Sequence, residues 1–333
     1  MWRKLQKILS TTVPGFLLVA YLAIVVCYLN RWDAMVAVTL VPIWAWAAVG
    51  MVLSLLVWTV CRGVLPGVLF CLFLATAIAF SEETHGLVRQ LIASIEARQA
   101  KEPEPVGKIL RVATANCAGA ESVLRRAAES EPDILVIQES PDKAVLDAVA
   151  DRLYGAGRTV IKVGSLAVIA RGESLGVMGD EAQNVLHVRL KLPDGFLIDL
   201  TNLDLKGCAP RRDQWEPAVW KELTAARIET RRLVRTHLGE HPLNRAKTGR
   251  FVCGGFGTPA GDDVFRPLEA SEMIDAYAWS GQGWGNTYPT QFPYLRLDQI
   301  WVSSNLTPQK TVTRLSPESE HRIVVTEVTL PVN

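Results

Sequence analysis

The sequence predicts an α+β domain of about 225 residues behind a membrane-spanning N-terminal third. Two observations predict it. Apolar residues make up 49% of the 333-residue chain, and the excess of them lies in the first 80 residues. The polar remainder alternates strand-like and helix-like segments at first and then runs through short strands that read as hairpins. This order is typical of sheets packed face to face with helices outside.

Three apolar runs without a charged side chain cover about residues 13–29, 34–60 and 64–80. A helix of about 17–25 residues crosses the hydrocarbon core. A cleaved signal peptide would explain only the first run, and turns of a few residues argue against buried soluble helices. We therefore expect residues 1–80 to be an anchor of three transmembrane helices in the lipid bilayer.

Basic residues favour one orientation of this anchor. Arg3, Lys4 and Lys7 precede the first run, whereas the acidic "SEETH" follows the third. Positive flanks stay on the cytoplasmic side. Three spans would then place the rest of the chain outside the cytoplasm, as an extracytoplasmic domain of a multi-pass protein of the cell (inner) membrane.

A stalk is expected between the anchor and the domain, at residues 81–107. Ser81 fits a helix N-cap, with Glu82 and Glu83 in the first turn. The Pro-rich, charged "KEPEPVGK" at 101–108 reads as a stiff linker. The domain would then occupy residues 108–333.

Charge and cysteine content restrict the possible functions. The net charge is +1, so no global basic field supports a nucleic-acid partner. No CxxC pair suggests zinc. Cys117, Cys208 and Cys253 lie in the polar part, and three states stay open for them: unpaired and buried, one disulfide, or a soft metal site.

Polar side chains recur where the predicted strands end. They are Asn116, Glu139, Asp204, Asp298 and His321. Each one alone reads as a turn or capping residue. Their recurrence at strand ends instead predicts one shared cleft, in which oxygen ligands would suit a hard metal ion.

Four segments carry a resemblance to a known family: "RVATANCAG", "PDILVIQES", "GNTYPTQFPYLRLDQIWVS" and "SEHRIVVTEVTL". In this order they resemble the endonuclease/exonuclease/phosphatase superfamily, and three preceding spans resemble its bacterial membrane-anchored members. The resemblance covers residues 108–331. It implies the deoxyribonuclease-I-like fold, a two-sheet β-sandwich flanked by helices in four αββα layers.

The resemblance also implies a metal-dependent site. Mg²⁺ or Mn²⁺ would be held by Glu139 and, in place of an aspartate, Glu320. Asn116 would help to hold the site and bind substrate, and Asp298 and His321 would be catalytic. The ion would polarise a phosphoryl oxygen and help to form the nucleophile.

Several positions depart from the family pattern. Gly255 and Gly257 stand where the family has an acid and an asparagine, Asp204 replaces a histidine, and Gln299 replaces another. Losing a positioned acid or base costs about 10²–10⁴-fold in rate. One hypothesis makes Asp204 a partial replacement, as metal ligand or base, for the acid lost at 255. The alternative makes it a tolerated surface acid.

These observations favour a divergent metal-dependent phosphoesterase with impaired or altered catalysis. Its substrate would carry a phosphate, and a membrane tether favours a lipid-linked one. The alternative is a non-catalytic binding module, a pseudoenzyme that docks a phosphate ligand or a protein partner at the membrane. A purely structural role in a membrane complex is the third possibility, which retained Glu139, Asp298 and His321 disfavour.

Overall fold

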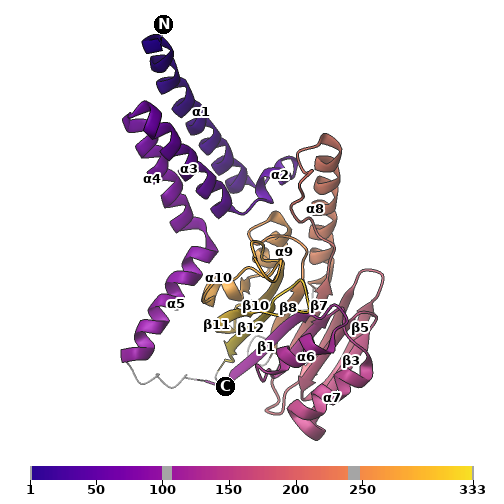
Figure 1. The fold of residues 1–333 in the computed structure, drawn as a ribbon. Helices are drawn as coiled ribbons and strands as arrows, with labels where there is room; N and C mark the ends of the chain where they lie inside the picture. The colour runs from indigo at the N-terminus through magenta and orange to yellow at the C-terminus, as the bar shows by residue number, and fades with distance from the viewer. Residues whose placement is uncertain (1, 100–106, 239–247, 332–333) are drawn as a thin grey trace. The chain divides into compact units, whose positions relative to one another are not determined.

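The computed structural model describes residues 2–99, 107–238 and 248–331 (Figure 1). Residues 100–106, which include most of the predicted linker, lie outside the described residues. The chain divides into two compact units. The first comprises Met1–His85 with Pro210–Arg227, and the second comprises Gly86–Ala209 with Ile228–Asn333.

Helices make up the described part of the first unit. Two of them, at Thr12–Asn30 and Ile43–Val60, are long and apolar enough to cross a membrane. By length and composition, a third candidate span is counted when α4 is taken together with the start of α5, from which it is bent by 67°. The elements are α1 (Trp2–Asn30), η1 (Asp33–Met35), α2 (Val36–Thr39), α3 (Ile43–Cys61), α4 (Val64–Phe80) and α5 (Glu82–Gln99).

The second apolar run is not one helix from 34 to 60, so this predicted boundary was wrong. Short helices η1 and α2 end at Thr39, and the long helix α3 starts only at Ile43. Pro42 lies between them with extended backbone angles, φ −56° and ψ 140°. A proline lacks the N–H that a continuing helix needs and disfavours helix at the residue before it.

The second unit contains two six-stranded sheets, as the sequence predicts. The first has the order β11-β12-β1-β2-β4-β3 and the second the order β5-β6-β7-β8-β10-β9. Pairs β1/β2 and β7/β8 are parallel, and the other pairs are antiparallel. The strands are β1 (Ile109–Asn116), β2 (Ile134–Gln138), β3 (Arg158–Val163), β4 (Leu166–Arg171), β5 (Glu173–Asp180), β6 (Val185–Lys191), β7 (Leu197–Asp204), β8 (Thr248–Gly255), β9 (Met273–Asp275), β10 (Asp298–Ser303), β11 (Thr307–Arg314) and β12 (Ile323–Thr329).

Alternating side chains of the first sheet build two cores. Val112 and Ile134 belong to the core shared with the second sheet. Their neighbours Ala113 and Leu135 point to the opposite face and pack beneath helices. Because successive strand residues face opposite sides, an unbroken apolar run such as "ILVI" signals a strand buried on both faces.

Helices α6 (Glu121–Ala128) and α7 (Lys143–Tyr154) cover the outer face of the first sheet, and Figure 1 shows them beside β1 and β3. The first has apolar residues at helical spacing on one side, including Val123, Leu124 and Ala127, all fully buried. The remaining helices are η2 (Gly155–Gly157), α8 (Pro217–His237), η3 (Asp263–Phe265), α9 (Arg266–Ala270) and α10 (Ala276–Ser280).

A buried amide pair bridges the two sheets. Asn202 of β7 donates its side-chain N–H groups to the main-chain oxygens of Ile137 and Ala167, at 2.9 and 3.0 Å. Its Oδ1 accepts a hydrogen bond of 2.7 Å from Gln138 Nε2. Both amides are fully buried. A polar group in a core is tolerated when its hydrogen bonds are made, and these bonds fix how the sheets face one another.

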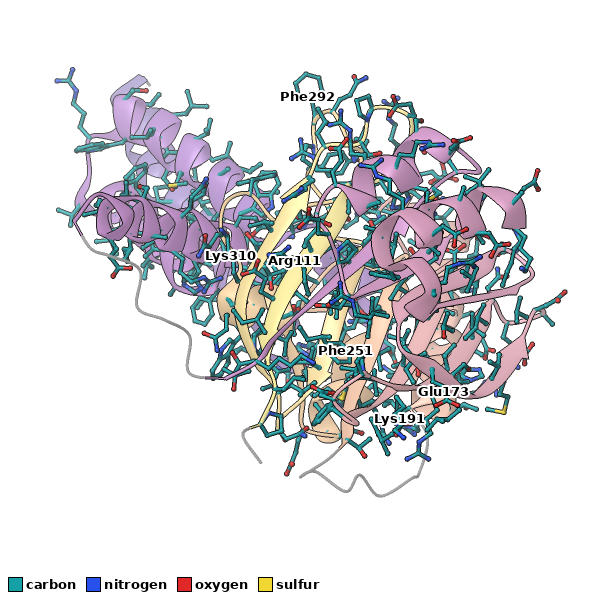
Figure 2. The ribbon with its side chains drawn as sticks, turned by 90° about the horizontal axis from the view of Figure 1, so that it is seen from below. Arg111, Glu173, Lys191, Phe251, Phe292 and Lys310 are labelled. Atoms are coloured by element: carbon teal, nitrogen blue, oxygen red, sulfur yellow. The ribbon has the colours of Figure 1, made fainter. Side chains whose placement is uncertain are left out.

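The carboxyl ends of both parallel pairs lie at one end of the sandwich, where β10 and β12 begin. The loop that carries Phe292 projects at one end, whereas Glu173 and Lys191 lie at the other (Figure 2). Phe251, by contrast, is buried between the sheets. The fold therefore gathers the strand ends that the sequence analysis singled out.

We expect Asn202→Ala to lower the free energy of unfolding by about 3–5 kcal/mol, because it removes one buried partner of Gln138 and the side-chain donor to two buried main-chain oxygens. Urea denaturation of the full-length protein in detergent measures this. Gln309→Ala removes an exposed amide and serves as the control, with a change under about 0.5 kcal/mol. A loss below about 1 kcal/mol for Asn202→Ala would show that the bridge is dispensable.

Candidate active site

Three neighbouring strands of the second sheet carry adjacent site positions. Asp204 ends β7 and pairs in register with Gly255, the last residue of β8. Gly255 pairs in turn with Asp298, the first residue of β10. Side chains at paired positions point to the same face of a sheet. The two aspartates therefore flank the glycine on one face.

The Asp204 carboxylate lies beside the space above Gly255. A Cβ atom at Gly255 would lie 3.1 Å from Asp204 Oδ1 and 3.7 Å from Asp298 Oδ1. A side chain at 255 would thus contact both carboxylates. The resemblance expects an acid at position 255, and the Asp204 carboxylate of the adjacent strand lies next to that position.

The first sheet contributes Asn116 and Glu139. Asn116 Nδ2 donates to Glu139 Oε1 at 2.8 Å, and its Oδ1 accepts from the Ala118 N–H at 3.0 Å. Glu139 has a positive φ of 43°, which is unusual for a residue with a long side chain. Its carbonyl accepts from the Gly119 N–H, which helps to hold this conformation. Such strain persists where surrounding contacts fix it, often at functional sites.

His321 and Asp298 form an ion pair. His321 Nδ1 lies 2.7 Å from Asp298 Oδ2. Burial lowers the pKa of His321, but the charge and hydrogen bond of Asp298, together with the Asp204 and Glu139 carboxylates, more than offset this and raise it to about 8. The imidazole is therefore mainly a cation at pH 7. Ser319 Oγ holds the turn before His321 by donating a hydrogen bond of 2.9 Å to the main-chain oxygen of Asn116.

Asp204 lies in a repulsive environment. Burial raises its pKa most, the carboxylates of Glu139 and Asp298 raise it further, and His321 opposes them, for a value of about 6. Asp298 Oδ1 is also buried and has no hydrogen-bond partner. The structure therefore brings together five predicted residues, and their carboxylates carry more negative charge than one histidine balances.

The residues of this cluster fit a hard divalent cation in their donor chemistry. Carboxylate oxygens are the preferred ligands of Mg²⁺ and Mn²⁺, and a cation would relieve the repulsion at Asp204 and give the unpartnered Asp298 oxygen a charge to face. In the described part of the chain, no three His, Cys, Asp or Glu side chains converge closely enough for one ion. Mg²⁺ commonly takes only one or two carboxylates and fills its other positions with water or phosphate oxygens.

The resemblance expects an asparagine at position 257, but the backbone there leaves no space for a side chain. Gly257 has φ +59°, and a Cβ there would lie 2.5 Å from the Lys206 oxygen and 2.6 Å from the Leu205 oxygen. The chain after β7 thus packs directly on the turn after β8. Cys208 N–H donates to Thr258 Oγ1 at 3.2 Å and joins the same two loops. The "GGFG" turn is a packed structure with no room for a side chain at 257.

Two other predicted positions lie away from the carboxylate cluster. Gln299 is buried, and its side chain accepts from Trp301 Nε1 at 3.0 Å and donates to the Arg296 oxygen. It supports the second sheet. Glu320 is exposed and faces Tyr288, whose pKa is raised by burial and then by this carboxylate. Glu320 therefore lies at the rim.

Sequence reasoning missed the residues that position Asp298 and His321. Thr287 Oγ1 accepts the N–H groups of Leu297 and Asp298, both at 3.1 Å. The Tyr288 ring lies 5.1 Å from the His321 ring. Both residues fall in "GNTYP", which marked the resemblance, but nothing in the string says which side chain turns toward the site.

All three cysteines of the domain are buried, and none forms a disulfide. Burial, and then the Glu139 charge, raises the pKa of Cys117 to about 12. Burial also raises the pKa of Cys253. The thiols of Cys117 and Cys253 therefore ionise less readily than a free thiol. Of the three predicted states, the structure has buried cysteines without a disulfide.

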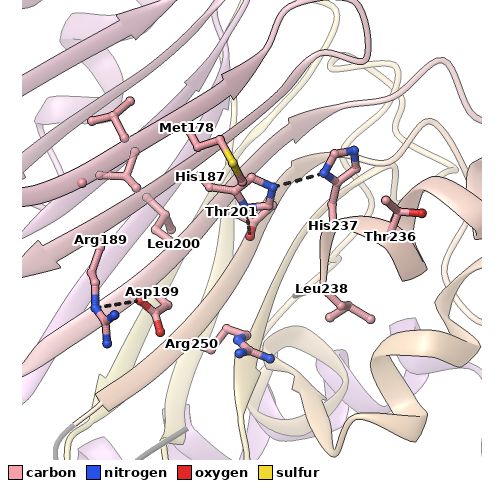
Figure 3. A pocket seen from close by; sticks show the side chains of 13 residues that line it. Met178, His187, Arg189, Asp199, Leu200, Thr201, Thr236, His237, Leu238 and Arg250 are labelled. Carbon is pink, nitrogen blue, oxygen red and sulfur yellow. Dashed lines mark hydrogen bonds and ion pairs between the residues drawn. The ribbon is translucent and has the colours of Figure 1, made fainter. Parts of the chain in front are cut away.

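A cavity of about 580 Å³ lies on the second sheet, apart from the carboxylate cluster, and a histidine pair lines it (Figure 3). His187 Nε2 lies 3.1 Å from His237 Nδ1, and the outer nitrogens bond to Thr201 Oγ1 and Gln183 Oε1. Burial, and then His237, lowers the pKa of His187 to about 4. Both rings are thus neutral at pH 7, since burial lowers the pKa of His237 too. None of these residues was predicted as functional.

We expect Gly257→Asn to destabilise the protein by about 2–4 kcal/mol without improving any activity, because its side chain would meet backbone at a positive φ. Gly261→Asn is the matched control. Gly261 has φ +77° but nothing within 4 Å of its Cβ position, so only the conformational cost of about 1 kcal/mol applies. Thermal unfolding compares the two, and equal losses would refute a packed turn at 257.

We expect Asp204→Asn to stabilise the metal-free protein at pH 7.5 by about 2–3 kcal/mol but not at pH 4. The folded state raises the pKa of Asp204 to about 6, so it binds the proton more tightly than the unfolded state does. The contribution of Asp204 to the free energy of unfolding is then greatest at low pH and is lost as the pH rises through 6. Urea unfolding in EDTA at several pH values measures this. A wild-type pH profile unchanged in the variant would contradict the repulsive environment.

Comparisons with known proteins agree with this architecture. Residues 113–321 match the Endonuclease/Exonuclease/phosphatase family. A family structure from Bacteroides thetaiotaomicron has 16% identity and a TM-score of 0.50, covering 68% of this chain and 100% of its own. One from Beutenbergia cavernae has 16% identity and a TM-score of 0.49, covering 67% and 72%. A mannosyl-6-phosphatase from Bacteroides thetaiotaomicron has 17% identity and a TM-score of 0.49, covering 66% and 100%.

Among curated proteins, none matches the chain. The structural likeness, at identities this low, shows the fold: two mixed sheets flanked by helices, as in deoxyribonuclease I. The family match spans more than half of the 333 residues and includes every strand end that forms the carboxylate cluster. The chain therefore belongs to the endonuclease/exonuclease/phosphatase family.

Proposed function

We propose that the protein is a membrane-anchored, metal-dependent phosphoesterase in which Asp204 takes over the work of the acid missing at position 255. One observation carries this proposal. The Asp204 carboxylate reaches to 3.1 Å from the position of a Cβ at Gly255, beside Asp298 and on the same face. A tolerated surface acid would not be expected to occupy the space of the missing side chain.

The electrostatics support the same role. An ionised, buried carboxylate with a pKa of about 6 destabilises the folded state unless it binds a cation or a proton. Perturbed carboxylates of this kind are typical of functional sites, because their proton affinity is matched to neutral pH. Above pH 6 Asp204 would be ionised, able to accept a proton from water or to bind a cation.

The other residues of the cluster have compatible roles. Glu139, held by Asn116, would bind Mg²⁺ or Mn²⁺, whose chemistry is to polarise a phosphoryl oxygen. The cationic His321, held by Asp298, would stabilise negative charge on the phosphate or protonate the leaving oxygen. Glu320 at the rim is the weaker candidate ligand, because it faces Tyr288.

The loop beside His321 favours an amphiphilic substrate. Phe292 is 82% exposed and Tyr294 is 45% exposed, on the segment that leads from Tyr288 to Leu295. Exposed aromatic side chains next to a charged site suit a ligand with an apolar part and a phosphate. Together with the apolar anchor, they favour a lipid-linked phosphate over a nucleic acid. The domain would act outside the cytoplasm.

A non-catalytic binding module is the second candidate. The packed turn at Gly257 favours it, because no side chain there can orient a phosphate. In that case the cationic His321 and the neighbouring aromatic loop would hold a phosphate ligand or a partner without hydrolysing it.

Calorimetric titration of Mn²⁺ into the full-length protein in detergent at pH 7.5 tests the proposal. We expect saturable binding that weakens at least about tenfold in Asp204→Asn and in Glu139→Gln, because each removes a carboxylate charge. Asp199→Asn is the matched control, since Asp199 lies on the same strand but pairs with Arg189. Its affinity should equal that of the wild type.

Hydrolysis of vesicle-borne and soluble phosphate esters then separates the two candidates. Mn²⁺-dependent phosphate release that Asp204→Asn abolishes would support the enzyme. Metal binding without release of phosphate would support the binding module. An Asp204→Asn protein that binds Mn²⁺ and turns over substrate like the wild type would sink the proposed role of Asp204.

A further inference from the structure

The segment 210–227 belongs to the first unit, which contains the candidate spans, although in sequence it lies between strands of the second unit. Four hydrogen bonds of 2.8–3.3 Å join it to the loop 31–42, which connects the two clear spans. Arg227 is fully buried there, so the contact is well packed. The bonds run from Gln214, Trp220, Thr224 and Arg227 to main-chain oxygens of Ala37, Ala34, Asp33 and Trp32.

Tryptophans continue this contact into the first turn of a span. Trp46 lies three residues after the start of α3, so it is within about 5 Å of the end of that helix. The Trp215 ring packs edge-on against it at 6.3 Å, and Trp220 packs on Trp215 at 5.9 Å. Trp215 and Trp32 stay about half exposed. Trp215 is therefore at the depth where a span leaves the hydrocarbon.

We infer that residues 210–227 and the loop 31–42 form one docking surface for the bilayer interface. Tryptophan is enriched at the membrane–water boundary because its ring is apolar and its N–H is polar. Here the rings of Trp32 and Trp215 face outward at the end of a span, while the Trp220 N–H is satisfied by Ala34. The occupant is the lipid headgroup region, continuous with the spans themselves.

This docking surface fixes the number of crossings. Two crossings would return the chain to the side of its N-terminus, opposite the loop 31–42. The segment 210–227 could not then reach that loop. Its contacts with Ala34 and Ala37 therefore require α4 to cross as well. Its 17 uncharged residues span about 25 Å, short of the usual core, but local thinning of the bilayer accommodates such a mismatch.

Spin labels test the docking surface in the full-length protein, reconstituted in phosphatidylcholine–phosphatidylglycerol vesicles. Cysteines of the parent that react with the label are first replaced by alanine. A label at Trp215→Cys should collide more with oxygen than with a water-soluble nickel chelate. A label at Lys221→Cys, at an exposed and charged position six residues later in helix α8, should show the reverse. Nickel-dominated collisions at both positions would overturn the inference.

Terminal tags test the number of crossings without altering the docking surface. An N-terminal and a C-terminal epitope are digested in sealed membrane vesicles by added protease. We expect one epitope to be cut and the other protected, because three crossings put them on opposite sides. Equal protection or equal cleavage of both would overturn the inference. Neither measurement depends on catalysis, so their failure is distinct from failure of the proposed phosphoesterase.

Discussion

The site depends on the register of three strands. Strands β7, β8 and β10 place Asp204, Gly255 and Asp298 side by side, and a shift of one residue in β7 or β10 would turn a carboxylate to the opposite face. The register is held from within the sandwich, where Asn202, two residues before Asp204, bonds to both strands of the opposite sheet that it faces. The packed core thus keeps these like charges close together and cannot rearrange to separate them. Proteins commonly retain such unfavourable electrostatic interactions at functional sites.

The sequence allowed the sandwich, two long apolar N-terminal helices and the five clustered residues to be predicted, because hydrophobic runs, strand periodicity and polar strand ends are local signals. Asn116, Glu139, Asp204, Asp298 and His321 all lie where that reasoning expected. Other features are not local. The position of Asp204 beside Gly255 follows from the register of two paired strands, in residues 51 positions apart in the sequence. Likewise, Gln299 was taken for a lost site residue, but strand alternation turns it toward Trp301.

The membrane and the site are connected through one short stretch of chain. Only five residues lie between Asp204 and Pro210, where the first unit begins again. Covalent geometry limits that distance to about 20 Å, whatever the arrangement of the two units. With residues 210–227 at the bilayer interface, the carboxylate cluster could never leave the neighbourhood of lipid headgroups. The anchor would then select substrates by confining the site, in addition to retaining the protein at the membrane.

Relocating the acid tests the central claim most directly. Asp204→Ala removes the carboxylate, and adding Gly255→Asp returns one to the adjacent strand, where only side-chain atoms lie near the new Cβ. We predict that Mn²⁺ affinity and phosphate release are lost in the single variant and regained, at least in part, in the double variant. A double variant no better than the single one, or a single variant that behaves like the wild type, would contradict the claim that Asp204 does the work of the missing acid.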